Sequence, residues 1–335
     1  MEPQKELNQN YLPYSPHPKS IGDEIDLREL FDALWKGKWI IIVTTIVFAV
    51  GAVLYSLSLP NIYKSDALLA PAESSSGGGL SKMASQLGGL AALAGVNLDA
   101  GESSQTDLAV QVMKSRQFVE AFISKHDLLV PLMAGKDWDL ANNKLILDKD
   151  LYSPSSGEWL REPNGLRGTT PTAQEAFEVF NKEILSVNQD KESGLYTVAV
   201  KYYSPYLAQQ WVNWLIEDIN KVMRERTIAE TSQNLAYLNA QLQKTAVADM
   251  QSMFYKLIEE QTKSLMLAEV QEEFIFKIVD PAVVPELEDG PKRALICVLG
   301  TLLGGMLGIA IVLLRFAFRK EDAGANSSRT RVLQN

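Results

Sequence analysis

Two long, uncharged apolar runs constrain this chain more than any other feature. One extends from Trp39 to Leu59 and the other from Ala294 to Leu314, at 21 residues each. A helix of that length rises about 31 Å, which matches the roughly 30 Å hydrocarbon core of a bilayer. The runs therefore predict two transmembrane helices, over residues 36–59 and 294–314. A signal peptide is the less favoured interpretation of the first run, which is too long and lacks a small-residue cleavage site.

The distribution of Lys and Arg predicts the topology. Eight cations lie on the terminal sides of the runs: Arg28, Lys36, Lys38, Arg315, Arg319, Lys320, Arg329 and Arg331. The inner sides carry only Lys64, Lys292 and Arg293. By the positive-inside rule, both tails, 1–35 and 315–335, are expected in the cytoplasm. Residues 60–293 then form a periplasmic domain of a two-pass protein in a bacterial inner membrane.

Charge and cysteine content exclude several classes of function. The net charge is −9 and the region between the runs is acidic, which argues against nucleic acid binding. Cys297 is the one cysteine and lies inside the second run, so neither an internal disulfide nor a cysteine cluster can form. A zinc site or a catalytic triad in the outer region would depend on His126 alone. We therefore expect no metal, no cofactor and no enzymatic activity.

The outer region contains a helical stretch of unusual length. From Tyr206 to Asp280 there are 75 residues without glycine or proline, against a mean helix of about 11 or 12 residues. Ser204 and Pro205 are a good N-cap and first helical residue. Because the chain must return to the membrane, the stretch predicts a helical hairpin over about residues 205–273. We place its reversal near Lys244–Asp249.

Shorter patterns predict an α/β base beside the membrane. Strands are expected over Ile62–Ala70, Ile184–Val187, Tyr196–Tyr202 and Phe274–Ile278, and helices over Thr106–His126 and after the Thr172–Glu175 capping box. The predicted fold class is α+β, with a long helical hairpin on this base and two flanking transmembrane helices.

Three further segments have weaker patterns. The tail over residues 1–20 is expected to be disordered, and Ile25–Trp35 to form a short amphipathic helix. Glu73–Ser104 is rich in Gly and Ser and predicts a mobile loop around a short helix. It lacks the spacing of a phosphate-binding loop, so nucleotide binding is rejected. Trp159 lies in a polar loop and is the better exposed candidate for stacking on sugars.

Glycines in the second run form a motif for close helix packing. Gly300, Gly304 and Gly308 make two overlapping GxxxG spacings on one helical face, with Gly305 beside them. Because glycine has no Cβ, backbones can approach closely and pack in lipid. The sequence leaves the partner open between the first run, another copy and another protein.

Four stretches together resemble the chain length determinant family, the Wzz-type polysaccharide co-polymerases. They are Ile25–Ile40; Ser85–Ala91 continuing to Gly95; Lys114–Arg116 with Phe118; and Asp280–Pro281, Pro285 and Pro291–Arg293 leading into Gly300, Gly304, Gly305 and Gly308. The last stretch is the most specific, since a proline-rich segment directly precedes a glycine-rich span.

The resemblance implies a homo-oligomeric scaffold that regulates the chain length of O-antigen or a related surface polysaccharide in lipopolysaccharide biosynthesis. Its implied partners are the O-antigen polymerase and undecaprenyl-linked polysaccharide. The short tail after Arg319 has neither a Walker motif nor a tyrosine, which places the chain with the kinase-free members. The alternative is a membrane adaptor for a separate cytoplasmic tyrosine kinase in capsule or exopolysaccharide export. A two-span sensor is less favoured, because that tail leaves no room for an output domain.

Overall fold

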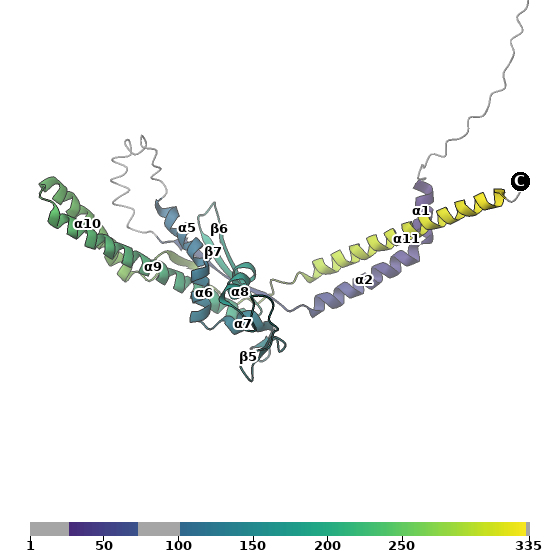
Figure 1. Cartoon of the computed structure of the whole chain (residues 1–335), viewed down its shortest axis with the longest axis horizontal. Coiled ribbons are helices and arrows are strands. Elements are labelled where there is room, and N and C mark those ends of the chain that lie inside the picture. The colour runs from purple at the N-terminus through teal and green to yellow at the C-terminus, as the bar shows by residue number, and fades with distance from the viewer. Residues whose placement is uncertain (1–26, 73–100, 333–335) are drawn as a thin grey trace, which may run out of the picture. The chain divides into compact units, whose positions relative to one another are not determined.

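The structure is a computed structural model that describes residues 27–72 and 101–332 (Figure 1). The tail expected over residues 1–20 and most of the Gly/Ser-rich loop, with its short helix, lie outside the described residues. The chain divides into two compact units, residues 1–55 with 294–335 and residues 56–293. Each unit contains helices whose starts and ends follow from local sequence.

The first unit contains three helices, α1 (Leu27–Lys36), α2 (Lys38–Ser58) and α11 (Arg293–Val332). Two apolar stretches, Lys38–Ser58 and Arg293–Phe318, are long and hydrophobic enough to cross a membrane. The α2 and α11 helices lie side by side, as Figure 1 shows. The α1 helix ends where Gly37 separates it from α2, and the Gly37 N–H donates to the Ala33 carbonyl at 2.9 Å. The chain therefore turns at one small residue between the two helices.

The second unit contains a four-stranded antiparallel sheet in the order β6-β7-β1-β8. Its strands are β1 (Tyr63–Pro71), β6 (Leu185–Gln189), β7 (Tyr196–Tyr202) and β8 (Phe276–Asp280), so all four expected strands are present within a few residues of their expected bounds. The alternating side chains of β7 are buried, with Val198 and Val200 fully excluded from solvent. The central strands β1 and β7 pack on the base of α9 (Pro205–Lys244).

Short helices cover the rest of this core. They are α5 (Gly101–Met113), α6 (Arg116–Lys125), α7 (Leu129–Ala134), α8 (Ala173–Val179) and the π-helix η2 (Phe180–Ile184). The single helix expected over Thr106–His126 is wrong. Ser115 adopts an extended backbone, and its hydroxyl accepts the Phe118 N–H at 3.3 Å, so it caps a new helix and breaks the stretch in two.

Two small β-hairpins follow α7. One pairs β2 (Gly135–Asp139) with β3 (Lys144–Leu147), and the other pairs β4 (Tyr152–Ser153) with β5 (Glu158–Trp159). Trp159 lies in the second of these and packs edge-on against Tyr152, with ring centroids 5.0 Å apart. The ring is half-buried, so the stacking surface expected there is partly covered.

The helical hairpin consists of α9 and α10 (Ala248–Val270), which pack against each other. Ser204 caps α9 by accepting the Leu207 N–H at 3.2 Å, and Pro205 begins the helix. The chain reverses over residues 245–247, inside the range expected from the sequence. Trp211, near the start of α9, is fully buried in the core of the base.

Candidate functional site: the paired spans and the proline segment

The glycines of α11 lie against α2 within the first unit. Gly300 faces Ala52, Gly304 faces Phe48 and Gly308 faces Thr44. The residue number falls by four on α2 as it rises by four on α11, so the helices run antiparallel. The first span therefore occupies this glycine face in the structure, out of the three partners that the sequence left open.

The packing is too close for a side chain at the centre of this face. A Cβ added to Gly304 would lie 2.5 Å from the Phe48 Cβ and 3.1 Å from the backbone Cα of Thr45. Contacts below 3.0 Å require a neighbour to move, and a backbone cannot move without shifting the helix. A Cβ at Gly305 would meet nothing closer than the Thr45 Oγ1 at 3.7 Å, an ordinary contact. The four predicted glycines thus differ in their surroundings, and Gly305 lies beside the tight face.

The proline segment, residues 280–293, belongs to the second unit and connects β8 to α11. The Ser65 hydroxyl of β1 donates to the Val283 carbonyl at 2.8 Å, and the Gln209 amide of α9 donates to the Ala282 carbonyl at 2.9 Å. Pro281, Pro285 and Pro291 lie in this segment. Because prolines lack an N–H and restrict φ, they disfavour a helix here, and the irregular segment is held by side chains of its neighbours.

The end of the proline segment is joined to the chain that leaves α2. The Ile62 N–H donates to the Gly290 carbonyl at 2.9 Å, and the Asp289 N–H donates back to the Ile62 carbonyl at 2.8 Å. Arg293 donates to the Asn61 side chain at 2.6 Å. These bonds bring together the two connecting segments, residues 56–62 and 289–293, and we call this cluster the junction.

One ion pair supports the junction from the sheet. Lys201 of β7 lies 2.7 Å from Asp289, and its hydrogen bond lowers the pKa of that carboxyl. Both side chains are partly exposed, so the pair positions the segment more than it stabilises the fold. The junction carries no group arranged for acid–base or nucleophilic chemistry.

The sequence patterns did not indicate that Asp218 is a buried carboxylate with charged and polar partners. Asp218 of α9 is buried and pairs with both Lys125 and His126 at the end of α6, with 2.9 Å between the Asp218 Oδ2 and the His126 Nε2. His126 also stacks on Trp214, with ring centroids 4.1 Å apart. In the described part of the chain no hydroxyl or thiol is hydrogen-bonded to this histidine, so the cluster ties α6 to α9 and completes no triad.

A second buried pair extends the predicted capping box. Thr172 caps α8 by accepting the Glu175 N–H at 3.2 Å, as expected. Arg161 adds a bond that the sequence did not reveal: its guanidinium donates to both Glu175 oxygens, at 2.5 and 3.1 Å. This hydrogen bond lowers the pKa of the Glu175 carboxyl and raises that of Arg161. The pair fixes the loop after β5 onto α8.

Metal binding finds no support in the part of the chain that the structure describes. Over residues 27–72 and 101–332, no three His, Cys, Asp or Glu side chains form a group that could hold a metal ion.

Comparison with known proteins shows which family the chain resembles. The model of the chain length determinant protein family, Wzz, matches residues 23–126. The Escherichia coli K12 protein named "Ferric enterobactin transport protein FepE" is 25% identical over 369 residues, covering 95% of this chain and 97% of the relative. The chain is therefore similar to the chain length determinant family. This similarity and the two apolar helices support an inner-membrane protein.

Other matches cover further parts of the chain. The GNVR model, described as "G-rich domain on putative tyrosine kinase", matches residues 239–317, which include α10, β8, the proline segment and much of α11. A solved structure titled "full-length bacterial polysaccharide co-polymerase" is 17% identical, covers 88% of this chain and 99% of its own, and has a TM-score of 0.38. A WzzB fragment from Salmonella Typhimurium is 10% identical, covers 68% and 99%, and has a TM-score of 0.30.

Proposed function

We propose that this chain is a non-enzymatic scaffold that regulates the length of O-antigen or a related surface polysaccharide. The observation that carries the proposal is the chain length determinant match at residues 23–126, in a chain whose two apolar helices precede and follow, in the sequence, an α/β base and a long helical hairpin. The scaffold works as a homo-oligomer with the membrane polymerase that extends undecaprenyl-linked repeats.

The proposed topology has both termini in the cytoplasm and the second unit in the periplasm. The excess of Lys and Arg on the terminal sides of both spans supports it. In this arrangement the whole second unit, including α9 and α10, lies in the periplasm.

The glycine face and the prolines then have distinct roles in the scaffold. Gly300, Gly304 and Gly308 let α2 and α11 pack in one fixed arrangement, and the junction holds together the two segments of the second unit that continue into these helices. Pro281, Pro285 and Pro291 keep the return segment out of a helix. We propose that subunit geometry set in this way determines how long the polymerase stays on a growing chain.

An adaptor for a separate tyrosine kinase is the alternative function, and no observation favours it. The description of the GNVR model mentions a kinase, but the matched residues include α10, β8 and the apolar part of α11. Co-purification of a cytoplasmic kinase with the full-length chain would support this alternative.

Deletion of the gene, followed by gel analysis of surface polysaccharide, tests the proposed function. We expect the deletion to abolish the preferred length class and expression of the full-length chain to restore it. A ladder unchanged by the deletion would refute chain-length regulation.

Substitution within the glycine face tests the role of the spans. Gly304→Leu is expected to shift the ladder, because any side chain there meets Phe48 and the α2 backbone. Gly305→Leu is the matched control, since the space at Gly305 admits a Cβ at an ordinary distance. If both variants restore the wild-type ladder, the glycine face has no part in length control, although the chain itself still does.

A further inference from the structure

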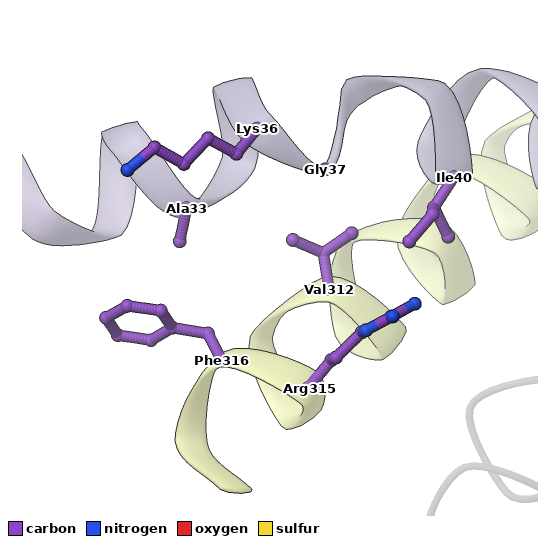
Figure 2. Close-up of a pocket in the computed structure, with 7 residues that line it drawn as sticks. All are labelled: Ala33, Lys36, Gly37, Ile40, Val312, Arg315 and Phe316. Atoms are coloured by element: carbon purple, nitrogen blue, oxygen red, sulfur yellow. The ribbon is translucent and has the colours of Figure 1, made fainter. Parts of the chain in front are cut away.

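A recess lies at one end of the two spans, between α1, the start of α2 and the later part of α11 (Figure 2). Its volume is about 320 Å³. Seven residues line it: Ala33, Lys36, Gly37, Ile40, Val312, Arg315 and Phe316. All of them belong to the first unit, and neither the glycine face nor the junction contributes to the recess.

The recess exists because α1 and α2 approach α11 closely at Gly37. A Cβ there would lie 2.5 Å from the Val312 Cγ1, so only glycine permits this approach without displacing the Val312 side chain. Val312 and Ala33 are buried at this contact, 5% and 8% exposed, and form an apolar floor. Helix α1 is thereby held beside the spans.

Two cations border this apolar floor. Lys36 belongs to α1 and Arg315 to α11. Figure 2 shows Lys36 extending along α1 and Arg315 extending from α11 toward Ile40, so their charged ends lie at different sides of the recess. Both are exposed, and neither forms an ion pair or a side-chain hydrogen bond with any residue that the structure describes. Lys38, which follows Gly37, instead lies over the Trp35 ring at 5.0 Å. The positive charge at the recess is therefore not neutralised by the described protein groups.

The aromatic residues around the recess place it at the headgroup level. Trp35 and Trp39 are 64% and 70% exposed, and such amphipathic rings favour the boundary between hydrocarbon and water. Arg315 lies three residues before the end of the second apolar stretch, and Ile40 near the start of the first. Apolar surface therefore continues from the recess along α2 and α11 into the hydrocarbon.

An unpaired pair of cations above an apolar floor is complementary to an amphiphile with an anionic head. We propose that the recess binds an anionic glycerophospholipid of the leaflet that faces the termini, with its anionic head attracted by the charges of Lys36 and Arg315 and an acyl chain along Ile40 and Val312. A zwitterionic lipid fits less well, because its own ammonium group offsets the phosphate. The bound lipid holds α1 against the spans and makes its position sensitive to leaflet charge. This inference does not rest on polysaccharide length control.

Native mass spectrometry of the full-length chain in neutral detergent tests the proposal, with dioleoylphosphatidylglycerol and dioleoylphosphatidylcholine as probes. Lys36→Gln with Arg315→Gln removes both cations of the recess. Lys38→Gln with Arg331→Gln removes the same charge from the terminal side of the spans, at two positions that do not line the recess. Because a cation near a lipid headgroup contributes roughly fivefold in affinity, we expect about a thirtyfold loss of phosphatidylglycerol binding in the first variant. The second variant is expected to bind like the wild type.

The possible results distinguish which kind of lipid, if any, binds specifically in the recess. Preferential retention of phosphatidylglycerol, lost only in the recess variant, supports the proposal. Equal retention of both lipids, or equal losses in the two variants, overturns it, because binding would then reflect surface charge alone. Tighter binding of a polyprenyl phosphate probe than of phosphatidylglycerol also overturns it, since the recess would then be assigned to another lipid. Circular dichroism of both variants verifies that the helices are retained.

Discussion

Asn220 fastens the last strand of the sheet to the root of the helical hairpin, and its removal should loosen that strand. The side chain is buried on α9, 4% exposed. Its Oδ1 accepts the N–H groups of Ile275 and Phe276 at 2.8 and 2.9 Å, and its Nδ2 donates to the Phe276 carbonyl at 3.0 Å. One amide thus satisfies three backbone groups where β8 begins.

The expected cost of Asn220→Ala follows from those three bonds. Each buried bond contributes about 1 kcal/mol net, and alanine leaves two donors and one acceptor without a partner away from water, so we expect a loss of about 3 kcal/mol. Every 1.4 kcal/mol changes an equilibrium about tenfold. Local opening at the start of β8 should therefore become roughly a hundredfold more frequent, since exchange reports such opening.

Hydrogen–deuterium exchange of the full-length chain in detergent measures this change at the amides of Ile275 and Phe276. Asn239→Ala is the matched control, because Asn239 lies on the same helix but is exposed and bonds only the Leu235 carbonyl one turn away. The control should leave exchange at β8 unchanged. Unaltered protection of both amides in Asn220→Ala would show that β1 alone holds the strand, which contradicts the reasoning.

Three further predictions concern ionisable groups of the second unit. The pKa of the Glu175 carboxyl is lowered in the fold, so the ionised side chain contributes stability above its ordinary pKa of 4.5, and this contribution is lost as the pH falls. Arg161→Gln should therefore reduce the difference in melting temperature between about pH 6 and pH 4. Burial and the hydrogen bond to Asp107 raise the pKa of Tyr196 to about 12, so the contribution of this side chain to stability is present below its ordinary pKa of 10.0 and is lost as the pH rises toward 12. Tyr196→Phe should remove this loss of stability at alkaline pH, as measured by denaturant titrations. Asp218→Asn leaves the Lys125 ammonium without its carboxylate and should cost about 2 kcal/mol. Tryptophan fluorescence during unfolding measures this change, and a stability equal to wild type would refute the tie between α6 and α9.

Local sequence patterns were sufficient for most elements of the fold. Ser204 and Pro205 predict the start of α9 because a cap and a first helical residue depend only on neighbours along the chain. Alternation over Tyr196–Tyr202 predicts β7 for the same reason, since side chains of a strand point alternately to its two faces. The break at Ser115 was missed, because its cap competes with a helical pattern that continues on both sides of it.

The candidate sites were less accessible to sequence reasoning. Spacing predicts that Gly300, Gly304 and Gly308 share one face, but it also groups Gly305 with them, and only the packing of α2 separates the crowded positions from the open one. The recess combines Lys36 with Arg315, which lie at opposite ends of the chain, so no local motif indicates it.

The sequence by itself determined the two apolar spans, the long unbroken helical stretch and the strand alternation, because length, periodicity and end-capping act between residues close along the chain. Only the tertiary structure decided which helix covers the glycine face, that Asn220 holds β8, and that Asp218 lies against His126, 92 positions away. Contacts of that separation depend on how whole elements pack, and a single sequence contains no local signal for them.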